Sequence, residues 1–539
     1  MLLDIYKDIC CRMGWNQRYF ISELLLKLED SLKQRALLLV DLPPGYGKST
    51  ATITLARYVI EEKNNEYFSR VIHVLPMRSI IEDLYERVRT ALNKYYSNDV
   101  DKYLAKQYML HPGSPFFVKK CVITTLDTFI LNFFKMPAHE LGKVFRDNIS
   151  HFEFPRAMIY TSLVIFDEFH LFSGLGSIDE ERKSLSSVLA AITSLLHSGV
   201  PIIVMTATMP TILKDYLIQE CKELGFKVDL IEYKEGYDVD FDTILKRKRR
   251  IVRKMNSLDD ALEELKRKYN DKMKVALIAN TVKTAIEIYK KINTALRVTD
   301  VILAHGHLPE SRRECINMLR ESGSILVATQ VVEAGIDLNF DIMITECPPA
   351  DRLVQRAGRV ARHSDYGEVW VFKASGNQPY DTKVIESTWD RLNDNTNLDW
   401  AYSRSILDNV YKDLDFKPLQ RLLRLLKYLD SYPIFGVKDA KEAYEYFNGF
   451  TDSAGIISIY RRGDYDPKNA VPLSERELIK LIRDDQIVFL TYDNKEVNKE
   501  KRKIYANKGK ISVFMLKEGY KGIIVSEDIY NNLIGVNGI

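Results

Sequence analysis

Cysteine is scarce in this chain and is not arranged as a metal site or a disulfide framework. The six cysteines stand at positions 10, 11, 121, 221, 315 and 347 of 539 residues, and no pair has the C-x-x-C spacing of zinc ligands. The sequence therefore argues against a zinc ribbon and a disulfide-stapled secreted fold, and it favours a reducing, intracellular compartment.

Long apolar runs and a strong charge of either sign are also missing. The opening segment MLLDIYKDICCRMGW carries charges inside its apolar stretch, unlike a signal peptide. No run of about 18 uncharged apolar residues occurs, so we expect no transmembrane helix, no membrane partner and a cytoplasmic protein. The net charge is only +3, so any attraction to nucleic acid must come from local basic patches.

Short apolar runs, each followed by polar turn residues and an amphipathic stretch, recur along most of the chain. This alternation is typical of parallel sheets with helices on both faces. We predict an α/β fold with units at 1–245 and 246–395 and a smaller C-terminal domain at 396–539. The expected strands are 36–40, 71–75, 122–125, 163–166 and 201–205, then 275–279, 301–304, 325–328, 342–345 and 368–372.

Three further stretches carry expectations about local structure. Residues 245–255, LKRKRRIVRKM, form the densest basic run, which is either a solvated linker or edge strand or a phosphate contact. Residues 419–429 have the apolar spacing of an amphipathic helix. From Gln486 onward, the segments IVFLTYD, KISVFML and KGIIVSE are each expected to form a short strand.

The clearest motif is DLPPGYGKST, from Asp41 to Thr50, directly after the first apolar run. Glycines let a turn approach an anion closely, and the following helix adds the positive end of its dipole. In such a loop Lys48 reaches the β- and γ-phosphates, and the Ser49 hydroxyl binds Mg²⁺. Leu42 replaces the first glycine of the full pattern G-x-x-x-x-G-K-[ST], so an ordinary strand-to-helix turn is the alternative.

A second motif, DEFH, ends the apolar run 163–166. Ligands of parallel α/β sheets gather at the carboxyl ends of strands, so this motif and the phosphate loop would share one crevice. Asp167 would hold Mg²⁺, and Glu168 would orient and deprotonate the attacking water. Phe169 would point into the core, and His170 would relay the nucleotide state. The alternative is a helix start with acidic residues near its dipole.

A third motif, TAT, follows the run 201–205 and places two small hydroxyls, Thr206 and Thr208, at the end of a strand. These hydroxyls would hydrogen-bond the acidic motif. Simple strand termination explains them equally well, since Thr and Pro both suit that position.

The most specific pattern lies in the second unit, where ATQVVEAGID is followed by QRAGRVAR. Arg356, Arg359 and Arg362 are three residues apart and would share one face of a helix start. Arginine forks suit phosphate oxygens, and arginines supplied from another lobe stabilise charge on a transferring phosphoryl group. The alternative is a solvated basic helix face, against which Gly358 argues, because glycine weakens an ordinary helix.

In this order, PPGYGKS, DEFH, TAT, TQVVEAGID and QRAGRVAR resemble the motifs of a superfamily 2 helicase, over about residues 15 to 375. A narrower resemblance is to the CRISPR-associated helicase of type I interference. It rests on Asn280-Thr-Val with Ala285, on ATQVVEAGIDL ending at Leu338, and on LAHGHL followed by two arginines. The resemblance implies two tandem RecA-like parallel-sheet domains with ATP and Mg²⁺ in their cleft. It also implies a C-terminal accessory domain that covers a channel or docks partners.

The resemblance implies roles for individual residues as well. The nucleotide would be held by Gln17, Pro44, Gly45, Tyr46, Gly47, Lys48, Ser49, Thr50, Gly335 and Asp337, with Gln17 at the adenine and the last two at the ribose side. The metal ligands would be Ser49 and Asp167, the base Glu168, and the γ-phosphate sensor and arginine fingers Gln355, Arg359 and Arg362. The residues that track the nucleic-acid backbone would be Pro76, Arg78, Thr124, Thr125, Asn280, Thr281 and Thr329.

One departure from the family concerns a nuclease. Many members carry a metal-binding His-Asp dipeptide at the N-terminus, whereas none of the nine histidines here is followed by aspartate and the phosphate loop begins near residue 45. We therefore expect the helicase half of a split system, as in the type I-A systems of archaea. Its partners would be single-stranded and duplex DNA, a separate HD-domain nuclease subunit and a crRNA-guided surveillance complex (Cascade), with unwinding from 3′ to 5′.

Two other functions fit the same ATPase motifs. A DExH-type RNA helicase without a CRISPR role would share the core and would differ in its substrate. An ATP-gated scaffold would bind nucleic acid or protein without unwinding. Intact Lys48, Glu168 and the three arginines argue against an inactive enzyme, but translocases that separate no strands carry the same motifs.

Overall fold

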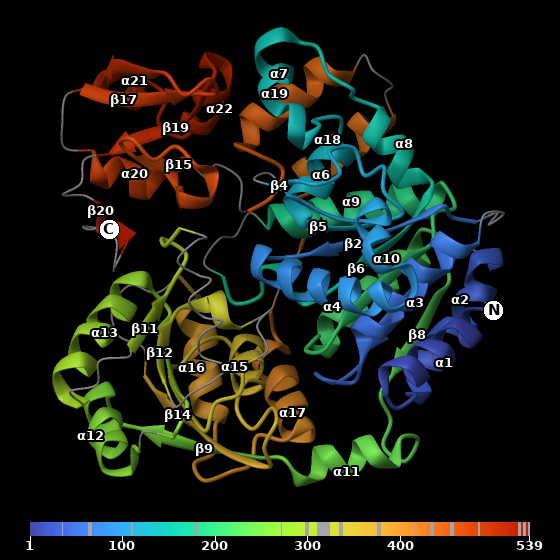
Figure 1. Ribbon diagram of the computed structural model, residues 1–539, viewed down its shortest axis with the longest axis vertical. Helices are drawn as coiled ribbons and strands as arrows, with labels where there is room; N and C mark the ends of the chain where they lie inside the picture. Colours follow the sequence, from blue (N-terminus) through green and yellow to red (C-terminus); the bar gives the residue numbers. More distant parts are fainter. Residues whose placement is uncertain are drawn as a thin grey trace.

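Three sheets with their helices and one two-stranded hairpin make up the described part of the chain (Figure 1). The computed structural model describes residues 1–34, 36–62, 67–108, 111–177, 182–270, 272–296, 301–309, 324–333, 338–373, 379–414, 417–431, 436–452, 457–482, 486–525, 530–531 and 535–536. The two larger sheets, with the helices on their faces, are called the first and second lobes below. None of the helices in these ranges combines the length and the apolar content that a bilayer crossing needs.

The first lobe is built on an eight-stranded sheet in the order β4-β3-β5-β2-β6-β7-β1-β8. All neighbours are parallel except β4, which is antiparallel to β3. The strands are β1 Leu37–Asp41, β2 Arg70–Leu75, β3 Leu104–Tyr108, β4 His111–Pro112, β5 Cys121–Thr125, β6 Ser162–Phe166, β7 Ile202–Thr206 and β8 Val228–Glu232.

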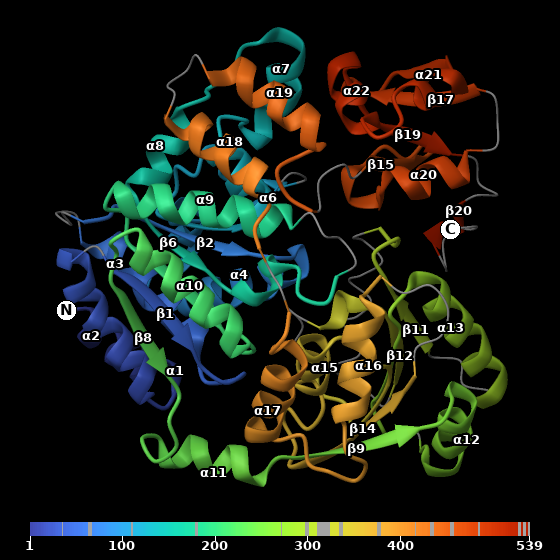
Figure 2. The ribbon, with the colours of Figure 1, turned by 180° about the vertical axis from the view of Figure 1, so that it is seen from behind.

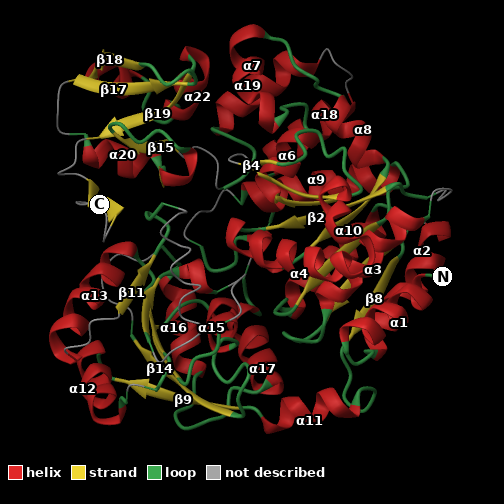
Figure 3. Ribbon diagram, viewed as in Figure 1, coloured by secondary structure: helices red, strands yellow, loops and turns green. Residues whose placement is uncertain are grey.

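Helices cover both faces of this sheet because buried side chains alternate along each strand (Figure 3). In β1, Leu38 and Val40 belong to one buried cluster with the helices α1 to α4, whereas Leu37 and Leu39 belong to a second cluster with α6, α9 and α10. The helices are α1 Leu2–Met13, α2 Tyr19–Gln34, α3 Lys48–Glu61, α4 Arg78–Tyr96, α5 Val100–Tyr103, α6 Leu126–Phe133, α7 Leu141–Asp147, α8 Phe154–Tyr160, α9 Lys183–His197 and α10 Thr211–Glu223.

The second lobe is built on a six-stranded, all-parallel sheet in the order β11-β12-β10-β13-β14-β9. The strands are β9 Arg249–Met255, β10 Val275–Ile278, β11 Val301–Ala304, β12 Ile325–Ala328, β13 Ile342–Glu346 and β14 Tyr366–Phe372. The helices are α12 Leu258–Lys268 and α13 Val282–Leu296 on one face, and α15 Ala350–Ala357, α16 Thr382–Arg391 and α17 Trp400–Tyr411 on the other.

These sheets confirm the predicted α/β class, and all ten predicted strands are present with ends within two residues of the predicted ones. The basic run forms the edge strand β9, so the edge-strand interpretation is confirmed. Helix α11 (Val239–Arg247) carries the chain from β8 of the first lobe to β9 of the second (Figure 2). Strands β3, β4 and β8 were not predicted.

The chain after Asn395 returns to both lobes. Helix α17 packs on α15 and α16 of the second lobe and also touches α10 of the first. Helix α18 (Gln420–Ser431), which confirms the predicted amphipathic helix, packs on α9, and α19 (Val437–Phe447) packs on α18. One buried cluster therefore runs from the first sheet through these helices to the second sheet.

The third, five-stranded sheet, called the small sheet below, has the order β16-β15-β19-β17-β18 and lies near α7 of the first lobe (Figure 1). Its strands are β15 Ile457–Arg461, β16 Val471–Leu473, β17 Gln486–Thr491, β18 Glu496–Glu500 and β19 Tyr520–Val525. Its helices are α20 Glu475–Leu481, α21 Lys501–Ala506 and α22 Ile511–Glu518, and β20 Tyr530–Asn531 pairs with β21 Gly535–Val536.

One predicted strand in this region is wrong. The segments IVFLTYD and KGIIVSE form β17 and β19, but KISVFML forms the helix α22. The carboxylate of Glu475 accepts hydrogen bonds from the backbone N–H groups of Ile511 and Ser512 and so caps the helix start. Ile511 and Met515, four residues apart, are buried in the core of the small sheet. Tertiary contacts therefore override the local β-propensity.

Candidate active site

The turn between β1 and α3 is built as an anion cradle. Gly45 and Gly47 have φ angles of 79° and 104°, in the left-handed region that side chains with a Cβ rarely adopt. Helix α3 begins at Lys48, so its first free N–H groups lie at the turn. The Lys48 ammonium donates a hydrogen bond of 3.0 Å to the carbonyl oxygen of Leu42 and so folds back over the loop. Ser49 and Thr50 stand in the first turn of the same helix.

Two apolar or aromatic side chains fix the loop to the first lobe. Tyr46 is buried, and its hydroxyl accepts a hydrogen bond from the Phe20 N–H at 3.1 Å and donates one to Asp238. Leu42, which stands where the full pattern has glycine, is also buried, and its N–H donates to the Thr206 carbonyl at 3.2 Å. Pro44 and the glycine that follows are exposed between these anchors.

Gln17 is exposed and lies just before α2, beside the loop. Its neighbours Asn16 and Arg18 donate hydrogen bonds of 2.8 and 2.7 Å to Asp240 on α11. The Arg18 guanidinium also lies 5.1 Å from the ring centre of Phe241. The segment around Gln17 is therefore held by the connector between the lobes, next to the phosphate loop.

Asp167 is held from the side of the phosphate loop by a histidine that the sequence did not single out. His73, buried in β2, lies with Nε2 3.3 Å from Asp167 Oδ2 and with Nδ1 3.0 Å from the hydroxyl of Thr52 on α3. Burial acts to raise the pKa of Asp167, but the His73 hydrogen bond and charge and the Lys48 charge outweigh it and lower that pKa. The signal for this role was a histidine inside the apolar run RVIHVL.

Glu168 has the environment of a proton acceptor. Its Oε2 is buried and has no hydrogen-bond partner among the described residues, and His170 Nδ1 lies 3.7 Å from it. Burial, with the charge of Asp167 next to it, raises the pKa of Glu168 to about 7. The residue has a φ of 51°, a strained left-handed value for a side chain of this size. The pKa of Asp167 is therefore lowered and that of Glu168 is raised. Two neighbouring carboxyl groups with separated pKa values can take different roles in acid and base chemistry.

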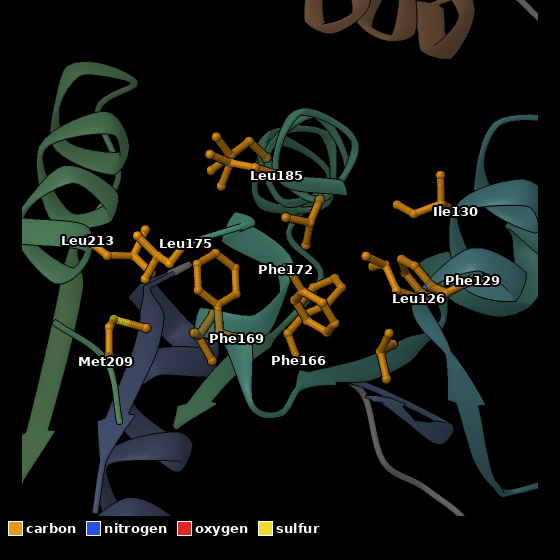
Figure 4. Close-up of a cluster of buried hydrophobic side chains, with 14 of the residues drawn as sticks. Leu126, Phe129, Ile130, Phe166, Phe169, Phe172, Leu175, Leu185, Met209 and Leu213 are labelled. Atoms are coloured by element: carbon orange, nitrogen blue, oxygen red, sulfur yellow. The ribbon is translucent and has the colours of Figure 1, made fainter. Parts of the chain in front are cut away.

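Phe169 turns into the core, as predicted. It is fully buried with Phe166, Leu175 and Met209 around it (Figure 4). This anchoring leaves the residues on either side of it in the chain, the acidic pair and His170, at the carboxyl edge of the sheet.

His170 joins three predicted residues in one buried network. Its Nδ1 lies 3.1 Å from the Thr206 hydroxyl, and its Nε2 lies 2.9 Å from the Thr208 hydroxyl and 2.7 Å from the Gln355 amide nitrogen. Because an amide N–H donates, Nε2 accepts and the ring proton stands on Nδ1. Burial and the charges of Arg352 and Lys48 lower the pKa of His170 well below its ordinary value. The predicted hydrogen bonds from TAT to DEFH are present, and Gln355 adds a direct contact between the lobes.

The prediction that three arginines share one helix face is wrong. Helix α15 ends at Ala357, so only Arg356 lies on it. Arg356 is fully buried, with Nε 2.8 Å from Glu333 Oε1 and Nη1 2.8 Å from the Thr345 hydroxyl. The packing of α15 on the second sheet therefore takes Arg356 into the core as the partner of a buried acid.

Arg359 and Arg362 lie beyond the helix and are half-buried. Nη2 of Arg359 donates to the Glu333 carbonyl oxygen at 2.9 Å, and the N–H of Arg362 donates to Asn339 Oδ1 at 2.6 Å. Gly335 and Asp337, predicted at the ribose side, lie outside the described residues.

One cavity lies between the two lobes at this point. It has a volume of about 120 Å³ and is lined on one side by Pro44 and Gly45 of the phosphate loop. On the other side it is lined by Val354, Ala357 and Gly358, at the end of α15. The loop that can bind phosphates therefore faces the QRAGRVAR motif across a shared space.

The residues predicted to track nucleic acid lie at or directly after the carboxyl ends of four parallel strands, two in each lobe. Pro76, Arg78 and Thr281 are half-buried, whereas Thr124, Thr125, Asn280 and Thr329 are buried. Their polar groups serve local structure here: Thr124 Oγ1 donates to the Gln107 carbonyl at 2.6 Å, and Thr125 and Thr281 cap the helices that follow them. The structure brings these positions to one edge of each sheet but leaves four of them without an exposed side chain.

Comparison with known proteins points the same way as this geometry. Residues 16–216 match the DEAD/DEAH box helicase family, and residues 271–365 match the C-terminal part of the CRISPR-associated nuclease/helicase Cas3. The CRISPR-associated helicase Cas3 of Thermoproteus tenax is 21% identical over 392 residues, which cover 70% of this chain and 63% of that protein. The CRISPR-associated nuclease/helicase Cas3 of Methanothermobacter thermautotrophicus is 25% identical over 414 residues, covering 69% of this chain and 45% of that protein.

The chain thus spans less than two thirds of the length of these relatives. The crystal structure of T. fusca Cas3 with ATP superimposes with a TM-score of 0.63 at 16% identity, covering 97% of this chain and 69% of that one. That likeness shows the tandem RecA-like fold. The motifs, the two family matches and the relatives together show that the chain belongs to the Cas3-like helicases.

Proposed function

We propose that this chain is an ATP-driven DNA helicase or translocase that acts in type I CRISPR interference. The observation that carries the proposal is the cavity between the phosphate loop and the end of α15, with Glu168 and the Gln355–His170 contact at the same edge of the first sheet. These are the groups that hydrolysis of a nucleoside triphosphate needs: a cradle, a base and cations from a second lobe.

Each residue would then act in turn. The N–H groups from Gly45 to Ser49 bind the phosphates, and Lys48 exchanges the Leu42 carbonyl for a phosphate oxygen. Glu168 orients the attacking water and accepts its proton. Arg359 and Arg362 stabilise the charge that develops on the γ-phosphoryl group.

The Ser49 hydroxyl and the Asp167 carboxylate would hold Mg²⁺. Both are hard oxygen donors, the kind that Mg²⁺ prefers, and the lowered pKa of Asp167 keeps it ionised. When bound, the metal would neutralise negative charge on the phosphates.

Hydrolysis would be converted to movement through the contacts between lobes. ATP touches both lobes, so it favours the closed arrangement only to the extent that it binds that arrangement more tightly. The network of His170, Thr206, Thr208 and Gln355 would report which nucleotide is bound. The nucleic-acid backbone would be held by Pro76, Arg78 and Thr281, together with the buried positions at the same strand ends. Contacts to the backbone carry little sequence information.

Sequence choice would come from a crRNA-guided surveillance complex, and DNA cleavage from a separate HD-domain nuclease. None of the nine histidines is followed by aspartate, and the Thermoproteus tenax relative is named a helicase without a nuclease. We expect purified protein to leave single-stranded DNA intact with Mg²⁺ or Mn²⁺, and metal-dependent degradation by clean protein would contradict the split arrangement.

Lys48→Ala should lower ATP turnover by at least about 100-fold, because it removes a cation from the phosphates. Steady-state phosphate release measures this, with Lys102→Ala, an exposed lysine paired with Asp99, as the matched control. A Lys48→Ala enzyme that hydrolyses ATP at the control rate would show that the loop is an ordinary strand-to-helix turn.

The substrate is tested by the ATPase rate without nucleic acid, with single-stranded DNA and with RNA of the same sequence. Stronger stimulation by DNA is expected, and a requirement for RNA would transfer the proposal to the RNA helicases. A tailed-duplex displacement assay then separates a helicase from an ATP-gated scaffold. Displacement with a 3′ tail and not with a 5′ tail is the expected result.

A further inference from the structure

Two cations of the basic run 245–255 reach the cavity described above. Lys248 lies at the end of α11, and Arg250 lies in the edge strand β9; both line the cavity opposite Pro44 and Gly45. The run therefore forms an edge strand and also contributes two side chains to the cavity at the phosphate loop.

Hydrogen bonds hold both side chains against the QRAGRVAR segment. The Lys248 ammonium donates to the carbonyl oxygen of Arg362 at 2.6 Å, and Nε of Arg250 donates to the carbonyl oxygen of Val360 at 2.8 Å. These bonds use one donor of each group. The Lys248 ammonium has three donors and the Arg250 guanidinium five, so each keeps donors for a further partner.

Neither side chain has an ion-pair partner within the described chain, although Asp399 also lines the cavity. No carboxylate in the described ranges lies within 4.0 Å of the Lys248 ammonium or the Arg250 guanidinium. Burial and the charges of Arg250 and Arg362 lower the pKa of Lys248 to about 8, although the charge of Asp365 acts to raise it. Burial and Arg362 also lower the pKa of Arg250 to about 10. Like charges gathered in a partly buried site are unfavourable until an anion joins them.

We propose that Lys248 and Arg250 bind phosphate oxygens of the nucleotide from the second lobe, in addition to the arginines of QRAGRVAR. The proposal deepens the proposed function and rests on it. A nucleotide phosphate fits better than a nucleic-acid backbone, because the same cavity is lined by Pro44 and Gly45 of the phosphate loop. The segment of α11 and β9 joins the two lobes. Its contact with the nucleotide would therefore depend on how many phosphates are bound.

The test compares Lys248→Met and Arg250→Gln with Arg249→Gln, which removes an exposed positive charge from the same strand outside the cavity. Calorimetric titrations use adenosine, ADP and a non-hydrolysable ATP analogue, and thermal unfolding is followed in parallel. Each cavity variant should bind the triphosphate analogue about tenfold more weakly than wild type, ADP less so, and adenosine equally. Arg250→Lys, which keeps the charge, should recover part of the loss.

Triphosphate affinities equal to that of Arg249→Gln in both cavity variants, with wild-type folding, would overturn the proposal. So would unchanged nucleotide affinity together with weaker binding of single-stranded DNA, since the two cations would then serve nucleic acid. Failure of the proposed function itself looks different, because wild-type protein would then bind no nucleotide in the same titration.

Discussion

Glu168→Gln should lower the rate of ATP hydrolysis by about 100- to 10,000-fold, the range that a positioned general base contributes, while ATP stays bound. The amide has nearly the shape of the carboxyl group and still orients a water, but it does not accept the proton. Glu168 Oε2 has no partner within the described chain, and the other carboxyl oxygen, which Gln keeps as its amide oxygen, can retain the hydrogen bond from the Ala207 backbone. In the wild type, repulsion between the two carboxylates contributes to the raised pKa of Glu168. The neutral amide of the variant removes this repulsion from Asp167.

Single-turnover hydrolysis and nucleotide binding, measured on the same preparation, separate the two effects. ATP affinity equal to or above that of wild type, with a strongly reduced rate, is the expected pattern. Glu263→Gln, an exposed glutamate on α12, serves as the matched control. Hydrolysis at the control rate would mean that another group accepts the proton, and weak ATP binding would mean that Glu168 holds the nucleotide or its metal.

The sequence predicts those parts of the site that depend on neighbours along the chain. The strands β1, β6 and β7 are continuous apolar runs because both their faces are buried, so each was found within one residue of its predicted ends. The residues that follow such strands must gather at one edge of the sheet. This is why the phosphate loop, DEFH and TAT meet, and why His170 contacts Thr206 and Thr208.

The parts that depend on packing between distant segments were not predicted. Spacing by three residues places arginines on one face only while a helix continues, and α15 stops at Ala357. His73 was missed because its partners, Thr52 and Asp167, come from two other segments of the chain. Helix α22 was taken for a strand because its cap is Glu475, 36 residues earlier. Lys248 and Arg250 reach the cavity because of the path that α11 takes between the lobes. The local sequence pattern does not predict this path.

The corrected position of Arg356 changes what its mutation would do. The guanidinium contacts Glu333, Thr345 and the carbonyl of Glu346, all inside the second lobe, and it is fully buried. Glu333 also receives a hydrogen bond from Arg352 at 3.0 Å. Arg356 is therefore part of a buried ionic network that fixes α15 to the segment after β12, and so it positions Arg359 without touching the nucleotide.

Arg356→Ala should destabilise the second lobe by about 3–5 kcal/mol, because removal of one partner leaves a buried acid short of its compensating charge. Hydrogen exchange in β13 and α15 localises this loss, and urea unfolding gives its size. Arg359→Ala, which removes a half-buried side chain, should change stability much less and should instead lower ATP hydrolysis. If Arg356→Ala kept wild-type exchange and unfolding but lost hydrolysis, Arg356 would act on the nucleotide and its structural role would be refuted. The paired measurement thus decides which arginines of QRAGRVAR hold the lobe together and which act on the phosphate.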